Sequence, residues 1–176
     1  MIYKVCITGT ESTGKSTLAE KLSIYYKTVH VPDYSRYYID QLSHKYGKMD
    51  VLEIAHGIIE QEDRMMRHAN RFFFTDNCLI NIKIWLQYYN WEVPAWLEEQ
   101  ISKRKYHLWL LCDIDLTWVP DEQRSNPNDR VQLFGKFKSE LEKVGANFHI
   151  VSGNTPQQRL AAAVQCIDSL PLVVNK

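Results

Sequence analysis

Residues 9–16 read GTESTGKS, a full match to the phosphate-binding pattern G-x-x-x-x-G-K-[ST]. The segment follows an apolar run, Ile2–Thr8, and precedes a helical pattern from Ser16 to about Tyr26. In this context the two glycines let successive backbone N–H groups point inward at a helix N-terminus, where the helix dipole favours an anion. The sequence therefore predicts a P-loop that binds a nucleoside triphosphate.

Each loop position has an expected partner. Lys15 is expected to reach the β- and γ-phosphates of ATP, and the Ser16 hydroxyl to ligate Mg²⁺. ATP and Mg²⁺ are the cofactors that this motif implies. The predicted ATP-binding residues are Gly9, Glu11, Ser12, Thr13, Gly14, Lys15, Ser16 and Thr17.

Apolar runs alternate with helical periods along the rest of the chain, a pattern typical of βαβ units and a mostly parallel sheet. The expected strands are Ile2–Thr8, Thr28–Val31, Phe72–Thr75, His107–Cys112 and Phe148–Val151. The expected helices are Ser16–Tyr26, Tyr34–Tyr46, Val51–Ala69, Leu79–Tyr89, Ala95–Arg104, Asp129–Val144 and Pro156–Leu170. The predicted fold is an α/β P-loop NTPase: a doubly wound, five-stranded parallel sheet in the order 2-3-1-4-5, with helices on both faces.

Length and composition favour one compact domain spanning residues 1–176. Charged residues make up 24% of the chain, and 21 Lys+Arg balance 21 Asp+Glu. This balance argues against a broadly basic nucleic-acid binder. Four cysteines without CxxC spacing favour reduced thiols, and no apolar run approaches the roughly 18 residues of a membrane span, so we expect a soluble cytoplasmic protein.

A P-loop protein also needs a carboxylate at the end of a strand beside the P-loop strand. Two runs qualify, FFFTD ending at Asp76 and LWLLCD ending at Asp113. We prefer Asp76 as the second Mg²⁺ ligand because chain order makes its strand the third, which P-loop kinases insert next to the first. Asp113 is interpreted as a strand-end cap.

The type of P-loop protein is narrowed by what the chain contains. It has no guanine-reading N-K-x-D segment, and motor and AAA-type ATPases generally exceed 176 residues. A small kinase remains, which needs a mobile basic lid. Residues at about 116–130 are the candidate lid, with Arg124 and Arg130 available to stabilise the transferring phosphoryl group; the alternative is a solvated loop with surface arginines.

A kinase must also orient the acceptor hydroxyl and take its proton, which a carboxylate usually does. Asp33 follows the second strand at the carboxyl edge of the sheet and is the candidate base. Asp76 is the rival candidate, and an Asx-capped turn after Pro32 is the structural alternative for Asp33.

Longer matches now add to the P-loop: GTESTGKST, VPDYSRYYI, FFTDNCLINIKIW and LWLLCDIDLTWVPDEQRSNPNDR. Together they resemble the ribosylnicotinamide kinase domain of NadR and its stand-alone relatives, from about Val5 to Gly153. The most specific segment is D-[LI]-x-W-x-x-D-x-x-R, carried here by Asp115, Trp118, Asp121 and Arg124.

The resemblance implies transfer of phosphate from ATP to the 5′-hydroxyl of nicotinamide riboside, giving nicotinamide mononucleotide. The family places an acid, Tyr and Arg after the second strand, here Asp33, Tyr34 and Arg36. The family motif D-T-[DE] reads instead Asp76-Asn77-Cys78, so its second acid is missing.

Because nicotinamide riboside is a flat cation, its pocket is expected to offer aromatic faces and carboxylates. Tyr34 and Trp118 are the candidate walls, and Asp63 the candidate acid; the alternative for Asp63 is a solvated helix face. The expected partner is a nucleoside, with no nucleic acid and no membrane. A separate adenylyltransferase would have to complete NAD synthesis. Two alternatives stay open: a kinase for another nucleoside or small metabolite, and an ATP-binding regulatory module without transfer activity, which the missing acid suggests.

Overall fold

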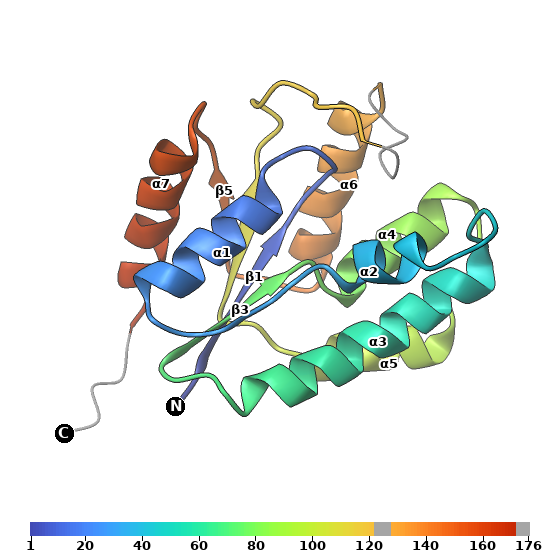
Figure 1. Cartoon of the computed structure of the whole chain (residues 1–176), viewed down its shortest axis with the longest axis horizontal. Coiled ribbons are helices and arrows are strands. Elements are labelled where there is room, and N and C mark those ends of the chain that lie inside the picture. Colours follow the sequence, from blue (N-terminus) through green and yellow to red (C-terminus); the bar gives the residue numbers. More distant parts are fainter. Residues whose placement is uncertain (122–127, 172–176) are drawn as a thin grey trace.

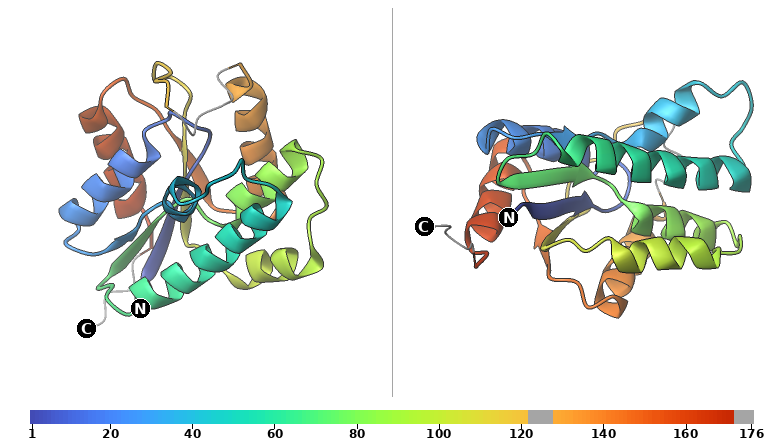
Figure 2. Two further views of the ribbon diagram at one scale, coloured as in Figure 1. Left: turned by 45° about the vertical axis from the view of Figure 1, so that its right-hand side comes forward. Right: turned by 90° about the horizontal axis from the view of Figure 1, so that it is seen from below.

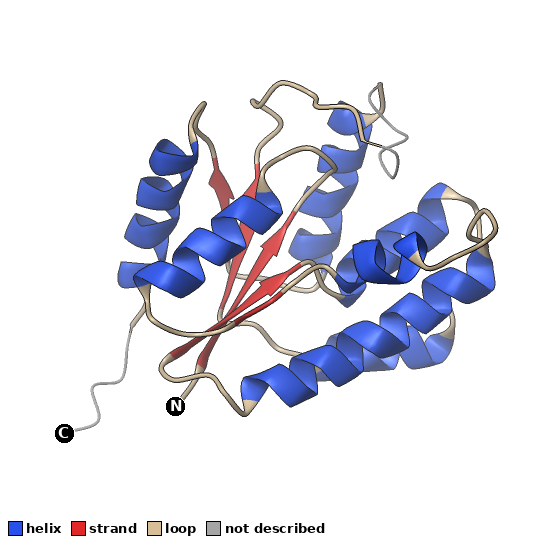
Figure 3. Cartoon of the chain, viewed as in Figure 1, coloured by secondary structure: helices blue, strands red, loops and turns tan. Residues whose placement is uncertain are grey.

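Five parallel strands form one sheet at the centre of the protein (Figures 1 and 3). The computed structural model describes residues 1–121 and 128–171. The strands are β1 (Tyr3–Thr8), β2 (His30–Val31), β3 (Phe72–Asp76), β4 (Leu108–Cys112) and β5 (Phe148–Val151). Their spatial order is β2-β3-β1-β4-β5, and every neighbouring pair is parallel. The predicted fold class and strand order are confirmed.

Helices cover both faces of this sheet (Figure 2). They are α1 (Lys15–Tyr25), α2 (Tyr34–Asp40), α3 (Lys48–Met66), α4 (Leu79–Tyr88), α5 (Ala95–Lys103), α6 (Arg130–Lys143) and α7 (Pro156–Asp168). Helices α1 and α7 pack together on one face, while α4 contacts α3, α5 and α6 on the other. Within the described ranges, none of the helices combines the length and the apolar character needed to cross a membrane.

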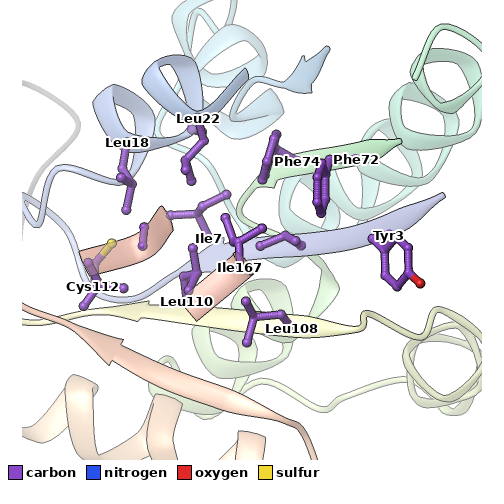
Figure 4. Close-up of a cluster of buried hydrophobic side chains, with 14 residues drawn as sticks. Tyr3, Ile7, Leu18, Leu22, Phe72, Phe74, Leu108, Leu110, Cys112 and Ile167 are labelled. Carbon is purple, nitrogen blue, oxygen red and sulfur yellow. The ribbon is translucent and has the colours of Figure 1, made fainter. Parts of the chain in front are cut away.

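The core is built on the central strands of the sheet, which are buried along their whole length. All five residues of β3 and all five of β4 are buried, as expected for central strands covered on both sides. On one face, Ile7, Leu110 and Phe74 meet Leu18 and Leu22 of α1 (Figure 4). Burying each such side chain contributes roughly 1.5–3 kcal/mol, so this layer fixes β1 and the loop that follows it.

Helix α2 is shorter than the sequence predicted. It ends at Asp40 rather than Tyr46, and none of its side chains is completely buried, so packing gives little to extend it. The next helix begins early instead: Asp50 Oδ2 accepts a hydrogen bond from the Gly47 N–H at 2.8 Å, which caps α3 ahead of Lys48. The connection between them carries Tyr46 toward the interior.

The contact between α2 and α3 depends on one glycine. Gly57 is buried on α3, and a Cβ atom at this position would lie 2.0 Å from Cε1 of Tyr34 on α2. The Tyr34 ring therefore lies directly against the backbone of α3. This close approach sets the position of α2 and of Asp33, which is its N-cap residue.

Candidate nucleotide and acceptor site

The loop between β1 and α1 has the backbone of an anion cradle. Gly9 (φ +133°), Ser12 (φ 57°) and Gly14 (φ +76°) all adopt positive φ, which reverses the chain tightly. Gly14 is the N-cap of α1, and a Cβ on Gly9 would lie 3.0 Å from the Cys112 carbonyl oxygen. Both motif glycines are thus required by conformation, and the amides at the start of α1 face the loop.

Polar side chains brace this loop from within. Lys15 Nζ donates to the Thr10 carbonyl at 2.7 Å, and the buried Thr13 hydroxyl donates to the same oxygen at 2.8 Å. The Lys15 ammonium therefore lies across the cradle, at the position where the motif expects it to meet phosphate oxygens.

The far side of the loop is held by the segment after β4. The Val119 N–H donates to Ser12 Oγ at 2.9 Å, and Arg130 donates to the carbonyls of Ser12 (3.3 Å) and Leu116 (2.9 Å). The Arg130 guanidinium also lies 5.8 Å from the Trp118 ring centre. Arg130, at the start of α6, is thus close to the P-loop. The other expected lid arginine, Arg124, lies outside the described residues.

A second arginine supports the loop and was missed by the sequence analysis. Arg159 of α7 is 2% exposed and donates to the carbonyls of Thr13 (3.1 Å), Asp113 (3.1 Å) and Gly153 (2.9 Å). It also pairs with the Asp115 carboxylate. An arginine on an amphipathic helix gives no sequence signal of burial. Burial, and next the positive charge of Arg159, lower the pKa of Arg130, so a phosphate group here would meet two guanidinium charges.

Asp76 at the end of β3 carries a buried carboxylate without a partner. The residue is 4% exposed and pairs in register with Ile7 of β1, and among the residues that the structure describes neither carboxylate oxygen accepts a hydrogen bond. Burial, and next the nearby Asp33 charge, raise the pKa of Asp76 to about 6, while Lys15 and Ser16 act in the opposite direction. An orphaned buried carboxylate beside the P-loop fits a cation or a proton.

These donors fit the oxygen-rich environment that Mg²⁺ prefers: the Asp76 carboxylate and the Ser16 hydroxyl at the start of α1. Within residues 1–121 and 128–171, no group of three or more His, Cys, Asp or Glu side chains forms a separate metal cluster. The other candidate carboxylate, Asp113, accepts from the Ile114 N–H and the Ser152 hydroxyl, both at 2.8 Å, as a strand-end cap does.

One cavity of about 200 Å³ joins the P-loop to the space between α2, α3 and α4. At its phosphate end it is lined by Gly9 and residues 11–17, which include every predicted ATP-binding residue. Its other end is mostly apolar, with polar groups at one side. The lining residues there are Asp33, Ser35, Arg36, Ile39, Tyr46, Val51, Ile54, Ile58, Asn77, Asn81, Ile82 and Trp85.

The candidate base lines the acceptor end of this cavity. Asp33 caps α2: its Oδ1 accepts from the Ser35 N–H at 3.0 Å and from the Ser35 hydroxyl at 2.5 Å. Both of these hydrogen bonds use Oδ1. Asp33 can therefore cap α2 and still offer Oδ2 for the role of base. Arg36 lines the same cavity, and its guanidinium pairs with Asp121 at 3.0 Å.

Three residues expected at the acceptor lie elsewhere. Asp63 is outside the cavity, because Arg104 holds its carboxylate through two 2.9 Å hydrogen bonds. Tyr34 packs on Gly57 instead of lining the cavity, and Trp118 lies beside Arg130. The structure does not bring these three residues to the lining of this cavity, and their role at the acceptor stays a prediction.

The sequence did not single out the residues that line the acceptor end of the cavity. Val51, Ile54 and Ile58 follow helical spacing on α3, which is also the pattern of ordinary core residues. Tyr46 enters from the loop that the sequence assigned to a helix. The departure from D-T-[DE] gave a signal, because it drew attention to the turn Asp76-Asn77-Cys78, although the missing acid itself is at Cys78.

Cys78, which stands where the family has its second acid, faces away from the cavity. It is 1% exposed and packs in the core with Cys6 and Ile80. The polar contribution of this turn therefore comes from Asn77 and Asn81, which line the cavity.

Comparison with known families gives a match over residues 4–159 to the family model described as an AAA domain. From its length we expected the chain not to be an AAA-type ATPase, and the name of the matching family differs from that expectation.

Among curated proteins, the chain is similar to the trifunctional NAD biosynthesis/regulator protein NadR of Escherichia coli (strain K12). The two are 25% identical over 174 residues, which cover 94% of this chain and 42% of NadR. The chain therefore spans well under half the length of this relative.

Among solved structures, a NadR protein in complex with NR superposes with a TM-score of 0.80 at 15% identity, over 99% of this chain and 52% of that one. Thymidylate kinase from Ehrlichia chaffeensis gives a TM-score of 0.69 at 10% identity, over 94% of this chain and 98% of the kinase. At these identities the likeness is one of fold, and it is the fold of P-loop kinases.

Proposed function

The chain belongs to the AAA domain family, and from this premise we propose that it is an ATP-dependent nucleoside kinase. One observation carries the proposal: the P-loop and the Asp33 carboxylate line the same cavity, so a triphosphate and an acceptor hydroxyl can meet there. The similarity to NadR and the kinase fold of the structural neighbours support it.

The chemistry follows from the positions of the side chains. The P-loop amides and Lys15 bind the ATP phosphates, and Arg130 adds positive charge beside Ser12. Asp33 accepts the proton of the acceptor hydroxyl while the oxygen of that hydroxyl forms a bond to the γ-phosphorus. The bond between that phosphorus and the β,γ-bridging oxygen breaks, and its electron pair leaves with ADP. Arg124 is proposed as a second lid arginine.

Asp76 and Ser16 would hold Mg²⁺, which neutralises charge on the β- and γ-phosphates when it is bound. We assign Asp76 to this role and the base to Asp33, because Asp33 lines the cavity and Asp76 lies buried beneath the loop.

The finer proposal concerns the acceptor. We propose the 5′-hydroxyl of nicotinamide riboside, because the curated relative is a NadR protein and a NadR structure holds NR. Nicotinamide mononucleotide would be the product, and a separate adenylyltransferase would use it. We also propose that residues 1–176 act as a single kinase domain.

A second acceptor class is favoured by the apolar walls. Ile54, Ile58 and Ile82 face the acceptor end of the cavity, and such walls suit an uncharged base at least as well as a pyridinium. A kinase for an uncharged purine or pyrimidine nucleoside is therefore the second candidate.

A survey of acceptors separates the two. Purified chain is incubated with ATP, Mg²⁺ and nicotinamide riboside or one of the purine and pyrimidine nucleosides, and the products are identified by mass spectrometry. Turnover with nicotinamide riboside alone supports the first choice, and turnover with an uncharged nucleoside alone supports the second. Tight ATP binding without any phosphorylated product would instead support a regulatory module.

Two variants assign the machinery. Lys15→Ala should lose both ATP binding and transfer, because the ammonium that braces the loop is gone. Asp33→Ala should keep ATP binding and lose transfer by about 100-fold or more. Near-normal transfer by Asp33→Ala would move the base to Asp76.

A further inference from the structure

Asn77 sits in the turn between β3 and α4 in an unusual backbone conformation. Its φ is 70°, in the left-handed region that asparagine tolerates better than most residues. Its N–H donates to the Ile7 carbonyl at 2.9 Å, which ties the turn to β1. The backbone is therefore fixed, and the side chain is directed to the cavity that Asn77 lines.

Three side-chain hydrogen bonds run from β1 to Asp33 through this turn. The buried Thr8 hydroxyl donates to Asn81 Oδ1 at 2.9 Å, and Asn81 Nδ2 donates to Asn77 Oδ1 at 2.7 Å. Asn77 Nδ2 then donates to Asp33 Oδ2 at 2.6 Å. All three bonds point the same way, so each donor strengthens the next and the last ends on a carboxylate oxygen.

The orientation of the first amide is fixed independently. The Cys78 N–H also donates to Asn81 Oδ1, at 3.3 Å. Because a backbone N–H can only donate, the atom it contacts is the amide oxygen, and the NH₂ group of Asn81 faces Asn77. The backbone of Cys78 therefore sets the direction of the whole series.

We propose that Asn77 and Asn81 are positioning residues that aim the Asp33 carboxylate at the acceptor hydroxyl. The proposal rests on the role of Asp33 in the proposed kinase. Ser35 occupies Oδ1 twice and Asn77 occupies Oδ2 once, which leaves one of about four acceptor sites, on Oδ2, for the substrate. Neither Asn side chain touches the transferred phosphate in this scheme.

The neutrality of the two amides matters as much as their geometry. Asn77 directly follows Asp76 in the chain and donates to Asp33, so it lies beside both carboxylates. A third carboxylate at position 77 would add repulsion to this pair, whereas an amide supplies a donor without a charge. The turn between β3 and α4 thus lets Asp33 and Asp76 both act within one site.

Asn77→Asp is the most informative variant. It keeps the size of the side chain and the tolerance for positive φ, but it replaces the donor facing Asp33 with a second carboxylate. We expect transfer to fall by about 100-fold, with ATP affinity within about twofold of wild type. Asn81→Ala should lower kcat by about tenfold, also without weakening ATP binding.

Asn90→Ala is the matched control, because Asn90 also has a positive φ (55°) but does not line the cavity. Its kcat and KM should stay near wild type. In an Asp33→Ala background, Asn77→Asp should cause no further loss, since the carboxylate it positions is gone. Additive losses, or wild-type kinetics for Asn77→Asp, would overturn the proposal.

A readout without turnover separates this proposal from the proposed function. The side-chain amide proton resonances of Asn77 should shift in Asp33→Ala, and those of Asn90 should not. If the shift occurs but no nucleoside is phosphorylated, the series of hydrogen bonds stands and the kinase assignment fails. If the kinase is active and the Asn77 resonances do not respond, the positioning role is wrong.

Discussion

The two ends of the sheet each bury one carboxylate, and they treat it in opposite ways. At the amino end, Glu62 is 0% exposed, yet its oxygens accept hydrogen bonds from the Tyr106 hydroxyl and from Arg104 Nη1. At the carboxyl end, Asp76 is 4% exposed, and in the described part of the chain neither of its oxygens has a hydrogen-bond partner. Burial alone therefore does not mark a functional carboxylate.

The electrostatics show the same contrast. Burial raises the pKa of Glu62, but Tyr106, Lys4 and Arg104 all act against that rise. Burial and next the Asp33 charge raise the pKa of Asp76, although Lys15, Ser16 and Arg36 act against this rise. We expect the paired carboxylate to be a structural element, and the one that lies near a like charge to bind a ligand.

The largest effect should come from removing the Asp76 charge. We expect Asp76→Asn to lower the rate of phosphoryl transfer by about 1,000-fold, equivalent to roughly 4 kcal/mol, because the anion proposed to hold Mg²⁺ is lost. Single-turnover kinetics with the acceptor identified in the nucleoside survey measure this rate. The matched variant Glu62→Gln should stay within about twofold of wild type in its folded form. Equal losses in both variants would remove the distinction between the two ends.

Stability should respond in the reverse order. Glu62→Gln should lower the free energy of unfolding by about 2 kcal/mol, because the hydrogen bonds from Tyr106 and Arg104 to the carboxylate weaken, while Arg104 keeps its two bonds to Asp63. Urea denaturation followed by circular dichroism measures this change. A loss below about 0.5 kcal/mol would mean that the pairing at Glu62 contributes little to folding.

Asp76→Asn should stabilise the protein, and the gain should depend on pH. The folded-state pKa of about 6 lies above the ordinary value of 3.8, so between these values the folded protein keeps a proton that the unfolded chain has released. The stability from this group is complete below pH 3.8 and is lost as the pH rises to about 6. We therefore expect the variant to gain about 2 kcal/mol relative to wild type at pH 7, and little at pH 4. A difference that does not vary with pH would show that Asp76 is not the titrating group.

The smallest effect tests one partner of Glu62. Tyr106→Phe removes the hydroxyl that donates to Glu62 but keeps the ring that packs on Trp109 at 4.7 Å. The free energy of unfolding should fall by about 1 kcal/mol, with transfer activity unchanged. Thermal unfolding and the kinase assay report the two quantities on one preparation.

Local pattern predicted the parts of the site that the backbone builds. The P-loop glycines and the ends of β1 and β3 follow from turn chemistry and apolar runs, both of which lie within a short segment. The strand order also followed, because it depends on the same alternation of elements. The helix ends were predicted within a few residues, except at α2.

The acceptor walls could not be predicted in this way, because they depend on which side chains three separate helices turn toward one point. Asp63 and Asn77 illustrate the difficulty. The sequence gives no sign that Asp63, an acid on an exposed helix face, will pair with Arg104. An asparagine after a strand gives no sign that its amide will reach a carboxylate 44 positions away.

The contact of Tyr34 with the backbone at Gly57 makes a position outside the cavity a determinant of what happens inside it. Alanine at 57 would place a methyl group 2.0 Å from the ring, so α2 would have to shift outward, and Asp33 and Arg36 would move with it. Such a shift widens the acceptor end without altering any residue that lines it. Anyone selecting variants of this chain for bulkier acceptors can therefore begin at Gly57 and leave every cavity residue in place.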